Sequence, residues 1–437
     1  MRANVSGRAR ARTLRFPAGY SSPFRLDTPA GGRGFSKPNP ERAVRVQSAS
    51  LMLALLATPS VAADLAPAGS PPSSAPKIVT SVERHWTSNA LDSEFAIPDW
   101  YSLIRGSLQH EWQIDDGTVK FGAEIQATRY DTVKIEDDRA GALLLDVTRR
   151  VSPALELRGT LTYRLSTEGD DFAIGPFIIG TRAPKQVFGA QGQAGIDLGG
   201  GTALILELAN AYELLGESRF QDDVLPRTKL DPDKNRTQVG AKLMRTVGPA
   251  AYGVSSSAQF VSVEKLGSPP VGLSLAEYTL QAEAGYKGQT GASITGALGV
   301  QMLRGAQDIY QSVRPTWRVA VVQPLPHGFE LRGAYFGRFE TVDSDDPLAS
   351  WLQRGEIEAR FLMNERLTLA TGAFAELKEN LLYENKERAH GLYGEASFQA
   401  TKAVSLVVRV DYTQRFLTVI DVEKKTVDAF VGIRTKI

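Results

Sequence analysis

Apolar and polar residues alternate with a period of two over most of this chain, in blocks of ten to fourteen residues. Residues 118–130 show the pattern well, with Phe121 and Ile125 on one face and Lys120 and Glu124 on the other. Successive side chains point about 180° apart on a strand but only about 100° apart on a helix. The alternation therefore predicts long strands that each have one apolar and one polar face.

The same rule predicts eighteen strands, with sixteen as the fallback. The segment at 77–88 has the weakest alternation and is supported mainly by the need for an even number. The predicted strands are 77–88, 100–112, 118–130, 139–150, 154–166, 185–198, 202–214, 236–247, 251–264, 275–287, 291–304, 312–323, 328–341, 352–363, 366–378, 389–401, 403–416 and 425–437.

The connections between these strands alternate in length. The short ones are rich in Gly, Asp, Asn and Pro, residues that suit tight hairpin turns, and lie near 115–117, 151–153, 199–201, 287–289 and 364–365. The long ones cover 167–184, 215–235, 265–274, 305–311, 342–351 and 379–388. The connections at one rim of the sheet are therefore short and those at the other rim are long, which is typical of transmembrane barrels. The apolar loop 167–184 either folds into the barrel mouth or forms an additional short strand pair.

Strands that face lipid must leave no backbone group unpaired, which requires the sheet to close on itself. We therefore predict an all-β fold, a closed antiparallel transmembrane β-barrel with short periplasmic turns and long external loops. A soluble sandwich would show the same alternation, but it has no reason to alternate turn lengths. Aromatic residues near strand ends are expected to form interfacial belts: Trp112, Tyr130, Tyr212, Tyr286, Tyr335, Phe398 and Tyr412.

Composition excludes several classes of site. The 437 residues include no Cys and only four His, so a disulfide framework, a cysteine nucleophile and thiolate metal centres are excluded, and we predict no cofactor and no metal site. Ten of the 50 basic residues but only two of the 49 acidic ones lie in residues 1–63, which leaves 40 against 47 in the rest. A mildly acidic body predicts that the chain does not bind nucleic acid.

The N-terminal region predicts export. The basic residues Arg42 and Arg45 precede a short apolar run, Leu51 to Ala57, and then small residues that end at Ala63. This order is that of a secretory signal peptide, with cleavage after Ala63 or one residue earlier. We therefore divide the chain into an N-terminal extension and signal peptide at 1–63, a Pro/Ser-rich periplasmic spacer at 64–76 and a barrel at 77–437.

Over residues 77–437 and the signal, the chain resembles bacterial outer-membrane β-barrel proteins of the porin-like kind. Its C-terminal end resembles the signal by which the barrel-assembly machinery recognises a final strand, with Gly432 five residues before the terminal Ile437. Thr435 departs from that pattern, which has an apolar residue two positions before the end. The resemblance implies the bacterial outer membrane as the location, and outer-membrane lipid, lipopolysaccharide and the assembly machinery as partners.

Charged residues on the polar face are candidates for lining a pore. They are Arg105, Glu124, Arg158, Arg164, Arg332, Arg338, Glu340, Arg354, Glu356, Glu358 and Arg360. Facing strands suggest that Glu340 pairs with Arg354 and Arg338 with Glu356, forming a girdle that narrows the channel. The alternative is that these charges only solvate and stiffen the inner wall.

Eighteen strands leave an aqueous opening unless a segment folds inside. We therefore predict a porin-like channel for passive diffusion of small polar solutes or ions. The alternative is a scaffold, a polysaccharide export duct or a surface receptor, and whether the barrel forms a homo-oligomer stays open. An enzyme is not predicted, because His390 is the only histidine near the external rim where a catalytic group would meet substrate.

Overall fold

The computed structural model describes residues 75–90, 96–174, 177–220, 224–265, 274–306, 310–341, 349–381, 386–417 and 422–436. The side chains of residues 168–180 and of Val422 are not described. The expected signal peptide, the cleavage site at Ala63, nearly all of the spacer and the terminal Ile437 lie outside the described residues and stay predictions.

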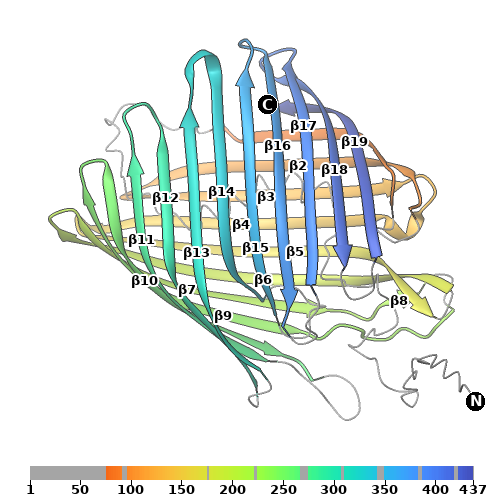
Figure 1. Ribbon diagram of the computed structural model, residues 1–437, viewed down its shortest axis with the longest axis horizontal. Coiled ribbons are helices and arrows are strands. Elements are labelled where there is room, and N and C mark those ends of the chain that lie inside the picture. The colour runs from red at the N-terminus through yellow and green to blue at the C-terminus, as the bar shows by residue number, and fades with distance from the viewer. Residues whose placement is uncertain are drawn as a thin grey trace, which may run out of the picture.

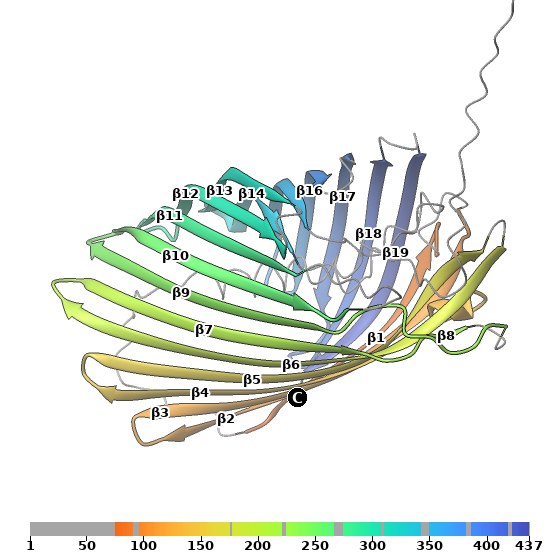
Figure 2. The same cartoon turned by 90° about the horizontal axis from the view of Figure 1, so that it is seen from below.

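The described strands form one antiparallel sheet that closes on itself (Figures 1 and 2). Eighteen of them make the ring, and the two-residue β8 lies beside β6. Their bounds are β1 Lys77–Thr87, β2 Asp99–Ile114, β3 Gly117–Tyr130, β4 Asp138–Ser152, β5 Leu155–Ile174, β6 Phe177–Gly199, β7 Thr202–Leu215, β8 Arg219–Phe220, β9 Lys234–Val247, β10 Ala250–Val263, β11 Leu275–Lys287, β12 Ser293–Gly305, β13 Gln311–Pro324, β14 Phe329–Glu340, β15 Ser350–Leu362, β16 Leu367–Asn380, β17 Lys386–Gln399, β18 Val404–Leu417 and β19 Val422–Lys436. Within the described ranges, two short 3-10 turns are present, Lys134–Glu136 and Pro326–Gly328. No helix among these residues has the length and apolar character needed to cross a membrane.

The first strand, which was the least supported by alternation, completes the ring. β1 pairs with β2 on one side and with β19 on the other, so that Val82 lies between Ile104 and Ile433. This double pairing confirms the strand predicted at 77–88. It also leaves neither the first nor the last strand as a free edge, as a lipid environment requires.

The tight turns lie at one rim, as predicted. Asp116 has a φ of 59°, and Gly199, Gly200 and Gly201 have φ values of 81°, 61° and 75°. These left-handed conformations favour glycine, and among other residues aspartate tolerates them better than most, which explains the residues found there. The rim formed by these short turns also contains the start of β1 and the end of β19, and the longer connections lie at the opposite, external rim.

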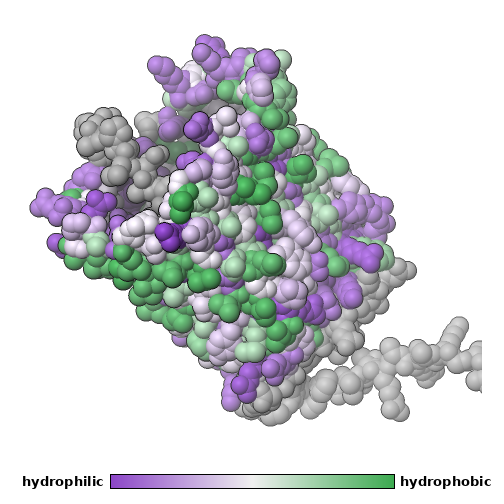
Figure 3. All heavy atoms as spheres, turned by 60° about the vertical axis from the view of Figure 1, so that its left-hand side comes forward, coloured by the Kyte–Doolittle hydropathy of each residue, from purple (hydrophilic) through white to green (hydrophobic). Residues whose placement is uncertain are grey.

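The apolar faces of the strands point out of the ring. Ile125, Leu280 and Leu298 are exposed over 70%, 64% and 65% of their surface, whereas the polar Asp146 and Arg409 are buried. Figure 3 shows hydrophobic side chains gathered across the middle of one outer face and hydrophilic ones towards its margins. A soluble sandwich would bury these apolar residues, so the chain is a transmembrane β-barrel of the bacterial outer-membrane type.

Of the two structures predicted for 167–184, the strand pair is the one found, because β5 and β6 continue as a paired hairpin through Ile174 and Phe177. One expected aromatic position is wrong. Tyr130, expected in the outer aromatic belt, is paired with the inward-facing Tyr101 and stacks on it, with 4.6 Å between ring centroids. By contrast, Trp112, Tyr212, Tyr286, Tyr335 and Phe398 are exposed on the outer face as expected.

Candidate functional site

Every charged residue predicted to line a pore lies on the face of its strand opposite the lipid-facing residues. On β3, Glu124 alternates with the exposed Ile125, and on β2, Arg105 alternates with the exposed Ile104. The other candidates follow the same parity on β5, β14 and β15: Arg158, Arg164, Arg332, Arg338, Glu340, Arg354, Glu356, Glu358 and Arg360. That these side chains line a solute path stays a prediction.

Near the external rim the end of β14 separates from β13, while β14 stays paired with β15 as far as Ser350, and β15 with β16 as far as Asn380. β13 pairs with β14 only from Trp317 opposite Gly337 to Pro324 opposite Glu330. On its other side, β13 stays paired with β12 as far as Gln311. The last residues of β14 therefore separate from β13 while β13 continues along the wall.

Hydrogen bonds show that the separated hairpin lies inside the barrel. The backbone N–H of Phe339 donates to Gln301 Oε1 at 2.8 Å, and Gln259 Nε2 donates to Thr341 Oγ1 at 2.6 Å. Gln301 and Gln259 lie on the inward faces of β12 and β10. The end of β14 therefore crosses the inner surface of three neighbouring strands.

An apolar cluster holds the hairpin against that inner surface. Its buried members are Val261, Leu275 and Leu303 from the inward faces of β10 to β12, and Phe339, Ala349, Trp351 and Leu381 from β14 to β16 and their ends. Arg314, on the inward face of β13, donates to Glu379 at 2.9 Å and lies over the ring of Trp351, 5.3 Å from its centroid. At this rim the barrel therefore has two layers, and the inner layer occupies space that would otherwise belong to the lumen.

The predicted salt-bridge girdle is wrong in its pairing. Glu340 lies opposite Ser350, and Arg354 lies opposite Phe336, so the expected cross-strand pairs do not meet. Arg354 instead donates to Glu376 at 2.9 Å and to Glu356 at 3.4 Å, and it covers the ring of Phe374. The expected register is displaced by four residues, because β14 and β15 pair with Glu340 opposite Ser350 and not opposite Arg354.

Arg409 is the centre of a buried ion-pair network on the inward face of β18. Its guanidinium donates to Asp411, with distances of 2.7–3.0 Å, and to Glu395 at 3.3 Å. It also lies over the ring of Tyr393, 4.0 Å from the centroid. Only 3% of Arg409 is exposed, so its charge is balanced by these carboxylates rather than by water.

A second buried network joins β1 to its two neighbours, β2 and β19. Glu83 accepts from His85 at 3.0 Å and from Arg105 at 3.4 Å. His85 stacks on Tyr101 with 4.5 Å between centroids, and on its other side it lies 4.6 Å from Phe430. Sequence reasoning missed this cluster because the alternation of β1 is poor. The parity of Val82 was the signal that places Glu83 and His85 inside.

Gly432, the glycine of the expected assembly signal, lies beside the buried side chain of Glu83. A Cβ at Gly432 would lie 2.6 Å from Glu83 Cγ, so the missing side chain makes room for the buried carboxylate. The recognition role of Gly432 and Ile437 stays a prediction.

Loop side chains at the external rim form ion pairs of their own. Lys229 donates to Asp233 at 2.8 Å and to Glu264 at 2.6 Å. Burial opposes the charged form, but these two hydrogen bonds outweigh it and raise the pKa of Lys229. Among the described residues, no cluster of three or more His, Asp or Glu could hold a metal ion.

His390 lies on the lipid-facing side of β17, between Ala375 of β16 and Gln414 of β18. Neither register neighbour is a nucleophile that a histidine base could activate.

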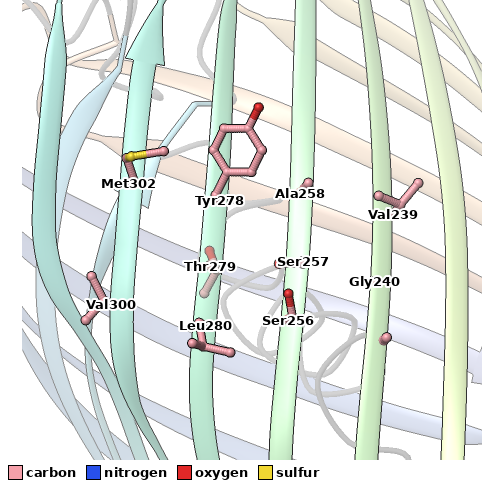
Figure 4. Close-up of a pocket in the computed structure, with 11 residues that line it drawn as sticks. Val239, Gly240, Ser256, Ser257, Ala258, Tyr278, Thr279, Leu280, Val300 and Met302 are labelled. Carbon is pink, nitrogen blue, oxygen red and sulfur yellow. The ribbon is translucent and has the colours of Figure 1, made fainter.

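A groove of about 600 Å³ lies on the outer face of β9 to β12 (Figure 4). Val239, Tyr278, Leu280, Val300 and Met302 form its sides, and the small residues between them form its floor. Because the apolar members share the parity of the exposed residues, this groove opens towards lipid and is separate from the lumen.

Comparisons with known proteins agree with the architecture. No protein-family model and no curated protein matches this chain. Among solved structures, the copper transporter OprC aligns with a TM-score of 0.51 and 10% identity over 83% of this chain and 81% of that one. The ferric citrate transporter FecA in its unliganded form aligns with a TM-score of 0.45 and 13% identity over 79% of this chain and 60% of that one. The siderophore receptor PirA from Pseudomonas aeruginosa aligns with a TM-score of 0.44 and 8% identity over 84% of this chain and 81% of that one.

At such identities the likeness extends to the fold alone. It agrees with the closed barrel described above.

Proposed function

We propose that this chain is a solute-selective channel of the outer membrane, in which small hydrophilic solutes pass a constriction made by the β14–β15 hairpin. The observation that supports this most is the inward position of that hairpin, packed on β10 to β12 by a buried apolar cluster. A wall that only enclosed an open pore would have no need for this second layer. Selection by size and polarity follows from a narrowed lumen whose other walls carry charges.

The inner wall supports a hydrophilic solute rather than a single ion species. Its charged residues occur largely as neighbouring pairs of opposite sign, such as Arg354 with Glu376 and Arg158 with Asp146. Paired charges keep the inner wall hydrated without creating a strong electrostatic field of one sign. Such a wall favours neutral or zwitterionic polar solutes over small cations or anions.

This proposal narrows the passive porin predicted from sequence. A wide, unselective pore is the second candidate, and it is supported by the ring of eighteen strands. The solved structure with the highest TM-score quoted above is named as a copper transporter, and we carry over from it only the general class, transport across the outer membrane. A receptor that takes up its cargo only with external help would share the fold but show no passive flux.

Swelling of proteoliposomes that contain the purified chain tests the proposal. We expect rapid swelling in small sugars such as glucose, and a sharp fall in rate for tri- and tetrasaccharides, because the hairpin narrows the external mouth. Rates that decline only gradually with size would favour the unselective pore. An absence of swelling in every solute would contradict the channel and favour the receptor or scaffold.

Outer-membrane lipid, lipopolysaccharide and the barrel-assembly machinery are proposed as the partners of this barrel. The apolar outer face supports contact with lipid directly, since Leu280 and Leu298 would otherwise be exposed to water. Homo-oligomerisation is left to measurement of the mass of the detergent-solubilised protein.

A further inference from the structure

A recess of about 160 Å³ lies on the inner side of the wall, between β7 and β13. It is lined largely by polar side chains on the inward faces of five strands, including Glu207 of β7, Lys242 of β9, Glu283 of β11 and Arg318 of β13. The sequence-based candidates for pore lining include none of these residues. Convergent polar groups in a concave part of a protein wall are the usual form of a small-molecule site.

The charges in the recess largely cancel. Lys242 Nζ lies 2.6 Å from Glu283 Oε2, and both side chains are largely buried. Two acidic residues, Glu207 and Glu283, stand with two basic ones, Lys242 and Arg318. A recess with balanced charge holds a small ion poorly, because an ion would find no surplus of the opposite charge.

Several polar atoms in the recess are available to a ligand. Gln193 donates to Glu207 Oε1 at 3.3 Å, and within the described part of the chain no hydrogen bond is found to Oε2 of that carboxylate. Among the same described residues, the side chains of Gln238, Ser255 and Ser257 also have no hydrogen-bond partner. Together they offer hydroxyl and amide groups that both donate and accept, and one carboxylate oxygen that accepts.

Gly240 keeps the space beside the carboxylate open. It lies opposite Glu207 on one side and Ser257 on the other, and a Cβ built there would lie 3.9 Å from Glu207 Oε2. Its other nearest atoms are also at ordinary contact distances, so the backbone tolerates a larger residue. A longer side chain at this position would therefore fill the recess without straining the strand.

We propose that this recess is a binding subsite for an uncharged polyhydroxylated solute of monosaccharide size. Vicinal hydroxyls donate and accept in turn, which matches the free carboxylate oxygen, the amide and the serine hydroxyls. The volume equals that of roughly five water molecules, so part of a pyranose ring fills it while the rest stays in the lumen. The inference deepens the proposed function and rests on it for its biological meaning, although binding can be measured without transport.

Calorimetric titration of the detergent-solubilised barrel with D-glucose tests the subsite. We expect saturable binding to the unchanged chain and at least a tenfold loss in Gly240→Leu, because leucine fills the recess. Glu207→Gln, which removes charge but little volume, is expected to weaken binding several-fold. Gly192→Leu is the matched control, because Gly192 lies opposite the lipid-facing Leu208, has open space around it, and should leave binding unchanged.

The outcomes separate the two proposals. Absence of saturable heat with D-glucose, or equal binding in all three variants and the unchanged chain, would overturn the subsite even if liposomes swell selectively. Competition of L-lysine or L-glutamate with glucose at equal affinity would also overturn it, since the recess would then select charge. Glucose binding that is lost in Gly240→Leu, in a barrel that passes no solute, would support the subsite and contradict the channel.

Discussion

Replacing both Phe339 and Trp351 with alanine is expected to release the β14–β15 hairpin from the inner wall and to widen the lumen. The two rings meet edge to face, with 5.0 Å between centroids, and both are almost fully buried. Truncating a buried Phe or Trp to alanine typically costs about 3–5 kcal/mol. We therefore expect several-fold faster swelling of proteoliposomes in trisaccharides, with little change for glucose.

A thiol under the hairpin reports its position directly. Leu303 is fully buried in the same cluster, and the natural chain has no cysteine. A Leu303→Cys thiol should resist a water-soluble maleimide when the hairpin is packed, and react when the alanine pair is present. Trp112→Ala, which truncates an exposed ring on the outer face, is the control. A protected thiol and unchanged swelling in the alanine pair would show that the hairpin does not narrow the lumen.

Arg409→Met is expected to lower the free energy of unfolding by about 3 kcal/mol, because it leaves two partly buried carboxylates without their partner. Asp411 and Glu395 both accept from Arg409. The measurement is the urea midpoint of the barrel in lipid vesicles. Lys120→Met is the matched control, since Lys120 forms an exposed pair with Glu111, a kind of pair worth about 0–1 kcal/mol.

A triple variant separates the loss of the ion pair from the loss of packing. Arg409→Met together with Asp411→Asn and Glu395→Gln removes the unpaired charges and should recover much of the stability. If Arg409→Met unfolds at the same urea concentration as Lys120→Met, the network is not a determinant of stability. If the triple variant is no more stable than the single one, packing rather than charge explains the effect.

The barrel itself was predictable because lipid imposes a local rule. Each strand must show apolar residues at every second position, and a strand expected at 118–130 is found at Gly117–Tyr130. Closure then follows from the need to pair every backbone group. Even the inward position of Tyr130 was within reach, because it shares the parity of Lys120 and Glu124.

The hairpin that narrows the lumen was not predictable from alternation. By parity, Phe339 and Trp351 belong to the lipid-facing side of their strands, and yet both are buried. Their burial depends on contact with β10 to β12, far away in sequence. The register of β14 and β15 depends likewise on the geometry of their connection, so a four-residue displacement of Glu340 changed every expected partner.

The lumen recess was predictable in part: more than the hairpin, but less than the barrel. Parity alone places Glu207, Lys242 and Glu283 on the inward faces of their strands, so the sequence contained the signal that they face the interior. That Lys242 pairs with Glu283, two strands away and across β10, follows only from the curvature of the wall.

The central claim, that apolar side chains face lipid and polar ones face a water-filled interior, is tested most directly by thiol labelling along β3. Because the chain has no cysteine, Glu124→Cys and Ile125→Cys each introduce a single thiol. In proteoliposomes treated with a membrane-impermeant maleimide, the thiol at 124 should react and the thiol at 125 should be protected by lipid. Reaction at 125 with protection at 124, or equal reaction at both positions, would contradict the claim.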